Sequence, residues 1–108
     1  MRSFVFLVLL LSGCGGALAD GKNAFRKGRY AEARTILTEL EPEANTMSGS
    51  RHAEYTLYRG LTHLALGNRP ATLFWLGEVK RAVDANPTIL SDEDTGRLAS
   101  AWAHLESD

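Results

Sequence analysis

Residues 60–71 read Gly60-Leu61-Thr62-His63-Leu64-Ala65-Leu66-Gly67-Asn68-Arg69-Pro70-Ala71, and they contain the end of one predicted helix and the start of the next. Gly67 suits the left-handed conformation that ends many helices, so with Asn68 it marks the end of a helix over residues 51–66. Pro70 fits the first turn of a helix, because an N–H at that point has no intrahelical partner. The segment therefore predicts a helical hairpin whose second helix runs to about residue 85.

Apolar residues recur at the three-and-four spacing of a buried helical stripe in both helices of this hairpin. The positions in the first helix are Leu57, Tyr58, Leu61, Leu64 and Ala65, and those in the second are Leu73, Leu76, Val79 and Val83. Phe74 and Trp75 widen the second stripe sideways. Two adjacent bulky aromatics cannot both point into one narrow stripe. We expect both to pack in the core, one of them against a neighbouring helix; the alternative is that one is exposed for a partner.

Three further helices are predicted, and no segment alternates as a strand does. Asp20 begins a short helix that runs to about residue 27. The next spans residues 30–41, with Ala33, Ile36, Leu37 and Leu40 on one face, and Pro42 ends it and opens a polar loop to residue 50. Ser91 begins the last helix, where Asp94 makes an imperfect capping box. Its stripe is Leu98, Ala101, Trp102 and Leu105. The fold class is therefore all-α.

Two hairpins share glycine positions. Gly28, Tyr30 and Ala33 in the first, and Gly60 and Gly67 in the second, resemble tetratricopeptide repeats over about residues 20–87. Thr72 departs from that pattern, since the family prefers Ala there. The resemblance implies about two stacked hairpins plus a C-terminal capping helix, with first helices that hold a partner. The residues expected to do so are Lys22, Arg26, Tyr55 and Arg59. The alternative is an unrelated helical bundle.

The N-terminus has the layout of a secretory signal, with Arg2, an apolar run over residues 4–11 and then small residues. Leu11-Ser12-Gly13-Cys14 resembles the lipobox of bacterial lipoproteins. The resemblance implies a signal peptide over residues 1–13, an acylated Cys14 with a short tether to residue 19, and one helical-repeat domain over residues 20–108. An uncleaved signal anchor and an ordinary cleaved signal are the alternatives. In many lipoproteins of this kind an Asp after the cysteine serves as an inner-membrane retention signal. This chain has Gly15 there, so the resemblance implies the outer membrane, facing the periplasm.

The charge balance of the chain limits the kinds of partner that it is expected to bind. Without residues 1–13, which include Arg2, the chain keeps 11 basic and 13 acidic residues, a net charge of −2. This balance argues against a nucleic-acid partner, which needs a basic face. Basic residues do gather near the mature N-terminus, either as a solvated face or to attract anionic lipid or an acidic partner segment. They are Lys22, Arg26, Lys27, Arg29 and Arg34.

Catalytic and metal-binding patterns are missing from the sequence. His52, His63 and His104 lack the spacing of a zinc site, and Asp92-x-Asp94-x-Gly96 lacks the later ligands of a calcium loop. With Cys14 acylated, no thiol remains for a disulfide. We therefore expect no enzyme, cofactor, metal or small-molecule substrate. The expected function is a lipid-anchored adaptor or assembly factor for an envelope protein partner; the alternative is a structural lipoprotein that binds peptidoglycan or the membrane surface.

Overall fold

The computed structural model describes residues 16–107, and every regular element in that range is a helix, which confirms the all-α fold class. The predicted signal peptide and Cys14 lie outside the described residues. None of the helices in the described range is both long and apolar enough to cross a bilayer. The helices are an N-terminal helix described over residues 16–26, α2 (Tyr30–Glu39), α3 (Glu41–Ala44), α4 (Gly49–Ala65), α5 (Arg69–Ala85) and α6 (Asp92–Ser107).

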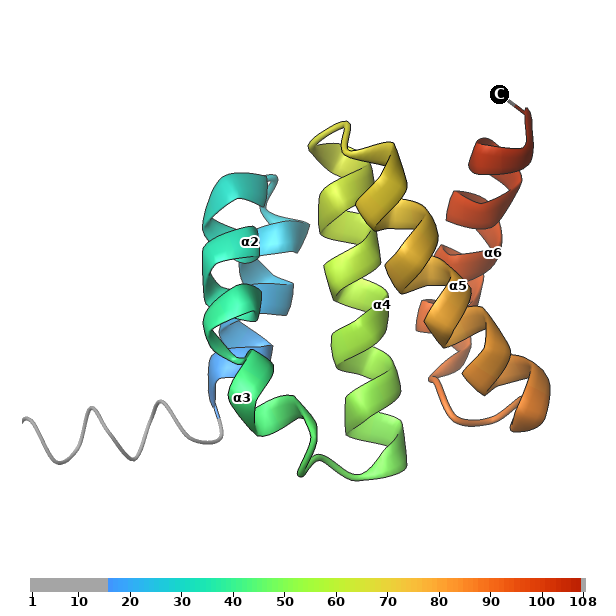
Figure 1. Cartoon of the computed structure of the whole chain (residues 1–108), viewed down its shortest axis with the longest axis horizontal. Coiled ribbons are helices and arrows are strands. Elements are labelled where there is room, and N and C mark those ends of the chain that lie inside the picture. The colour runs from blue at the N-terminus through green and yellow to red at the C-terminus, as the bar shows by residue number, and fades with distance from the viewer. Residues whose placement is uncertain (1–15, 108) are drawn as a thin grey trace, which may run out of the picture.

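Helix α4 is the centre of the molecule (Figure 1). The N-terminal helix and α2 lie to one side of it, α5 and α6 lie to the other, and α4 packs against α2, α5 and α6. Every residue from Tyr55 to Thr62 is buried, because α4 is covered from several directions. The single stripe predicted for this helix was therefore too narrow, and its last member, Ala65, is exposed.

The two hairpins pack in the same way. A Cβ added to Gly21 would lie 2.6 Å from Leu37 Cδ2, and one added to Gly60 would lie 3.1 Å from the backbone nitrogen of Leu76 and closer still to its side chain. Gly60 and Leu76 follow Gly21 and Leu37 by 39 residues each. Glycine is thus the residue that permits close helix contact at equivalent points of both hairpins.

The hairpin turns are equivalent too. Gly28 and Gly67, also 39 residues apart, both have a φ of 79°, a conformation that glycine adopts without strain. The side chain of Asn68 accepts a hydrogen bond from Ala71 N, and α5 begins at Arg69 with Pro70 in its first turn. The predicted end of one helix and start of the next are confirmed.

The buried face of α5 differs from the prediction. Leu73 is 42% exposed, whereas Thr72 is fully buried and its hydroxyl donates to Asn68 O at 2.7 Å. Thr72 stands 39 residues after the equally buried Ala33, at the equivalent position of the second hairpin. Thr72, Leu76 and Val79 therefore face the core. A small residue is needed here because the neighbouring helix is close.

Pro42 does not open a loop as predicted. Helix α2 ends at Glu39, and after Leu40 the chain forms the short helix α3, which contains Pro42 in its first turn. A proline inside a helix has no N–H to donate and clashes with the carbonyl four residues earlier. The equivalent residue of the second hairpin is Arg81, and α5 runs through it without a break. Pro42 therefore bends the second helix of the first hairpin.

The two ends of the described chain complete the core. The N-terminal helix was predicted to start at Asp20, but residues 16–19 are already helical and Leu18 is only 4% exposed. Those four residues are therefore packed helix and not tether. At the other end Ser91 caps α6 as predicted, since its hydroxyl accepts from Asp94 N at 3.1 Å. Leu98, Ala101 and Leu105 are buried, and Trp102 is half-buried.

Candidate functional site: a groove between α3 and α5

Two adjoining hollows of the described structure lie on one side of α4. Two pockets of about 420 Å³ and 300 Å³ share four lining residues, so we treat them as one groove, the α3–α5 groove. Its lining comes from α3, from the segment after α3, from α4, from α5 and from the α5–α6 loop. The residues are Glu41, Ala44, Asn45, Met47, Gly49, His52, Ala53, Tyr55, Thr56, Phe74, Trp75, Glu78, Val79, Ala82 and Ile89.

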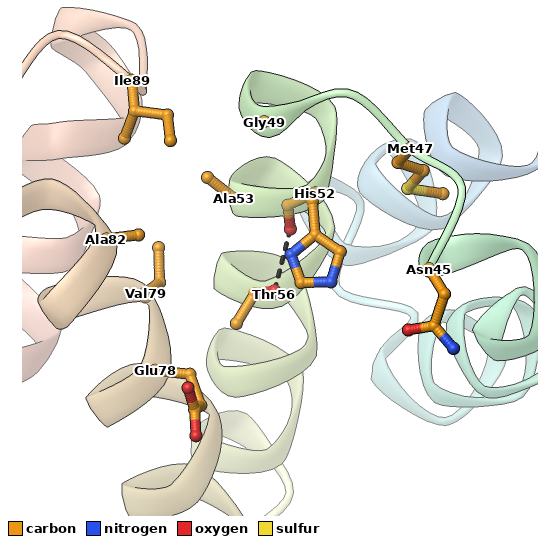
Figure 2. Close-up of a pocket in the computed structure, with 10 residues that line it drawn as sticks. All are labelled: Asn45, Met47, Gly49, His52, Ala53, Thr56, Glu78, Val79, Ala82 and Ile89. Atoms are coloured by element: carbon orange, nitrogen blue, oxygen red, sulfur yellow. Dashed lines mark hydrogen bonds between the residues drawn. The ribbon is translucent and has the colours of Figure 1, made fainter. Parts of the chain in front are cut away.

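One end of the groove is mainly apolar (Figure 2). Val79, Ala82 and Ile89 lie on one side and Met47 on the other, with Ala53 on the floor formed by α4. Polar groups at this end are already engaged in part: the Thr56 hydroxyl donates to His52 O at 2.8 Å. Asn45, His52 and Glu78 also line this end, so polar groups that a ligand can contact accompany the apolar side chains.

The other end of the groove is aromatic. Phe74 is 58% exposed, and its ring meets the half-buried Trp75 edge to face, with centroids 5.2 Å apart. Trp75 in turn meets Tyr55 edge to face at 6.1 Å. The prediction that Phe74 and Trp75 both pack in the core is wrong for Phe74. Successive residues of a helix point about 100° apart. Phe74, two residues before the buried Leu76, therefore points away from the core.

Arg59 supports this aromatic end from below. Its guanidinium lies 4.3 Å from the centroid of the Trp75 ring, a cation–π contact. Arg59 Nη1 also donates to the Tyr55 hydroxyl at 2.8 Å and to Glu41 Oε1 at 2.9 Å. Burial raises the pKa of Tyr55, although Arg59 opposes that shift. Arg59 is only 8% exposed, so its guanidinium interacts with groups inside the protein and holds Tyr55 and Trp75 in place.

A second polar cluster, the Tyr58 network, lies on another face of α4. The Tyr58 hydroxyl donates to Asp94 Oδ1 at 2.8 Å, and Arg97 Nη1 donates to the same oxygen at 3.1 Å. Arg26 Nη2 lies 3.3 Å from the Tyr58 hydroxyl and 3.9 Å from Glu93. Burial, followed by the hydrogen bond and charge of Asp94, raises the pKa of Tyr58 to about 12. This network ties the N-terminal helix, α4 and α6 together.

The four residues predicted to contact a partner fall into these two clusters. Tyr55, which is 1% exposed, lines the α3–α5 groove, and Arg59 is bonded to it. Arg26 belongs to the Tyr58 network, and Lys22 forms an ion pair with Glu54 beside that network. No single surface presents all four. Contact between these residues and a partner stays a prediction, and Tyr55 would act only through the side chains above it.

The remaining sequence candidates are dispersed. Within residues 16–107 no group of three or more His, Cys, Asp and Glu side chains is arranged to hold a metal ion. His63 is partly buried, and desolvation, with the charges of Arg59 and Arg34, lowers its pKa. Asp94, the second aspartate of the sequence that resembles the start of a calcium loop, is 5% exposed and accepts a hydrogen bond from Tyr58. Of the predicted basic group, Lys27 and Arg29 flank the turn at Gly28, at the far end of the N-terminal helix from residue 16.

Sequence reasoning missed the groove, although the sequence contained a signal for it. The 39-residue repeat pairs Pro42 with Arg81, and a proline in only one of two equivalent helices predicts a bend there. The bend places α3 as one wall of the groove, opposite α5.

No protein-family model matches this chain, and neither the curated proteins nor the solved structures include a match.

Proposed function

We propose that this protein is a non-catalytic adaptor of the bacterial envelope, anchored by lipid on Cys14, which binds a segment of a partner protein in the α3–α5 groove. The observation that carries the proposal is the combination of a hollow and an exposed aromatic residue. Phe74 leaves more than half of its surface in solvent at the mouth of the groove, in a domain whose other large apolar side chains are mostly buried. Exposed aromatic surface beside a concavity is typical of protein interaction sites.

The support beneath Phe74 strengthens this proposal. Trp75 and Tyr55 are held in edge-to-face contact and fixed from below by Arg59. A rigid aromatic surface loses little conformational entropy when a partner binds, so more of the contact energy appears as affinity. Phe74 therefore packs against aromatic side chains that are already held in place before a partner binds.

The anchor is the other half of the proposal, and it rests on the N-terminal motif. Residue 16 is already helical and Leu18 is already in the core, so only Gly15 separates Cys14 from the described helix. An acylated Cys14 would hold the domain close to the bilayer. Two or three acyl chains would make the attachment stable.

Site-specific photo-crosslinking in living cells tests the groove. A photoreactive amino acid at position 74 or 78 is expected to give the same crosslinked partner, because both positions line the groove. Position 73 is the matched control, since Leu73 is 42% exposed on the same helix but does not line the groove. A product of equal yield from position 73, or none from position 74, would contradict the proposal.

Substitution of the cysteine tests the anchor separately. Cys14→Ser is expected to move the protein out of the membrane fraction and to abolish incorporation of a labelled fatty acid. A serine variant that is still processed and still sediments with the envelope would contradict the lipid anchor while leaving the groove untouched.

A further inference from the structure

We propose that the ligand of the α3–α5 groove is a basic amphipathic helix, one that places apolar residues in the groove and Lys or Arg side chains at its rim. This inference rests on the proposed function and deepens it by naming the chemistry of the partner segment. It follows from the charge, the backbone and the length of the groove.

Charge gives the first argument. Among the lining residues the only carboxylates are Glu41 and Glu78, and no Lys or Arg lines the groove. The nearest buried cation, Arg59, is already engaged by Glu41 and Tyr55. Glu41 is thus paired with a buried cation. The side chain of Glu78 is 45% exposed and pairs with the exposed Arg81, so Glu78 is the carboxylate that a basic ligand can engage. An apolar groove with an accessible carboxylate and no lining Lys or Arg complements a basic, apolar segment.

Arg81 does not cancel this preference. It pairs with Glu78 at 2.8 Å, but its side chain is 70% exposed and it does not line the groove. Exposed pairs one helical turn apart are weak and screened by salt. A Lys or Arg of the ligand can therefore compete for Glu78, and Arg81 can swing into solvent at little cost.

The backbone of the groove favours a helix over an extended strand. The walls and most of the floor are helical, so their N–H and C=O groups are largely engaged within α3, α4 and α5. An extended ligand would bring unpaired backbone groups against an apolar surface, which is costly. A helix satisfies its own backbone and presents only side chains.

The length of the groove fits about two helical turns. Along α5 it extends from Phe74 to Ala82, which is about 12 Å at 1.5 Å per residue. Apolar residues at positions i, i+3 or i+4, and i+7 of a ligand helix cover that span. The first and last would meet the aromatic end at Phe74 and the apolar end at Ile89.

Fluorescence of Trp75 provides the test. The chain has two tryptophans, so Trp102→Phe in the full chain leaves Trp75 as the single reporter. Three helical peptides with the same apolar face are titrated, carrying Lys and Arg, Gln, or Glu on the polar face. We expect the basic peptide to bind at least about tenfold more tightly than the acidic one, with a preference that shrinks as salt is added.

Variants then locate the binding. Phe74→Ala is expected to weaken the basic peptide about tenfold, as loss of an exposed aromatic anchor does. Glu78→Gln should reduce the preference for the basic peptide without affecting the neutral one. The matched controls are Leu73→Ala and Glu106→Gln, exposed residues outside the groove, and neither should change binding.

The outcomes separate the two proposals. Equal affinity for the basic and acidic peptides, or no binding of any peptide, overturns the assignment of a basic helix. Binding that is indifferent to Phe74→Ala and Glu78→Gln overturns it as well. The proposed function is decided separately, by crosslinks at positions 74 and 78, and it survives a groove that prefers another chemistry.

Discussion

Tyr55 and Tyr58 lie one turn apart on α4 and are equally buried, yet the surfaces above them differ. The hydroxyl of Tyr58 is received by Asp94 of α6, so another helix closes that side of the molecule. The hydroxyl of Tyr55 instead accepts a hydrogen bond from Arg59 of the same helix, and its neighbours Phe74 and Trp75 border an open groove. Tyr58 thus joins α4 to α6, whereas Tyr55 supports the aromatic side chains at the groove.

Removal of the Arg59 side chain is expected to have the largest effect on the groove side of α4. Arg59→Ala deprives the buried Tyr55 hydroxyl of its partner and Trp75 of its cation, so we expect a loss of about 2–3 kcal/mol in the free energy of unfolding. Urea denaturation measures the loss, and Trp75 should become more exposed to a fluorescence quencher. Arg51→Ala, an exposed residue of the same helix, is the control and should change stability by less than about 0.5 kcal/mol. Equal effects would show that Arg59 does not support the groove.

Alkaline pH should lower the stability of the protein through Tyr58. The folded pKa of Tyr58 is about 12, above the usual value of 10, so between these two values the unfolded chain releases a proton that the folded chain keeps. Stability is therefore retained below pH 10 and falls as the pH rises towards 12, by about 2 kcal/mol from this group. Tyr55 contributes in the same direction, because its pKa is also raised.

Tyr58→Phe isolates the contribution of that hydroxyl. In urea denaturation at a series of pH values, the decline between pH 10 and 12 should be clearly smaller in Tyr58→Phe than in the parent. Tyr30→Phe, at a half-buried tyrosine, is the control and should leave the decline unchanged. Identical slopes in all three proteins would contradict the assignment to Tyr58.

Gly60 of α4 and Gly77 of α5 test what holds these two helices together. In Gly60→Ala the new methyl group meets Leu76, so we expect a loss of about 1–2 kcal/mol from overpacking. Gly77→Ala lies on α5 with nothing within 4 Å of the new Cβ, and it should gain about 0.5–1 kcal/mol because alanine favours the helix. Thermal unfolding distinguishes the two. A stabilising Gly60→Ala would mean that the helices are not in close contact there.

The smallest expected effect concerns Phe74 itself. Because the side chain is 58% exposed, Phe74→Ala should change the free energy of unfolding by less than about 0.5 kcal/mol, as should Leu73→Ala. The two variants should then differ only in peptide binding. A loss of several kcal/mol in Phe74→Ala would show that the ring serves the core and not a partner.

Local chemistry made much of the fold predictable. The left-handed turn at Gly67, the start of α5 near Pro70 and the cap at Ser91 each depend on residues within one helical turn, so the sequence alone specified them. The inward face of α5 was harder to predict, because periodicity ranks Leu73 above Thr72 by hydrophobicity. Only the distance to the neighbouring helix decides in favour of the smaller side chain. The pairing of Thr72 with Ala33 across the 39-residue repeat would have shown this.

The candidate site was less predictable for a different reason. The ion pair of Arg59 with Glu41 and the bond of Tyr58 to Asp94 join residues 18 and 36 positions apart, and no local rule connects them. Tyr55 and Arg59 were singled out as partner contacts because they lie on the first helix of the second hairpin, which the repeat resemblance assigns to partner binding. The structure buries both at the groove that Tyr55 lines, and the packing of α3 and α5 decides which side chains there reach solvent.

Pro42 leads to a last consequence. The chain contains its own undistorted reference, since α5 shows how a second helix runs when an arginine replaces that proline. One proline can therefore make two similar halves of a molecule differ in shape: the helix with the arginine runs on unbroken, and the helix with the proline bends and leaves a hollow between itself and α5. Pocket shape in such a protein can change while the glycine and leucine contacts that hold it together stay the same.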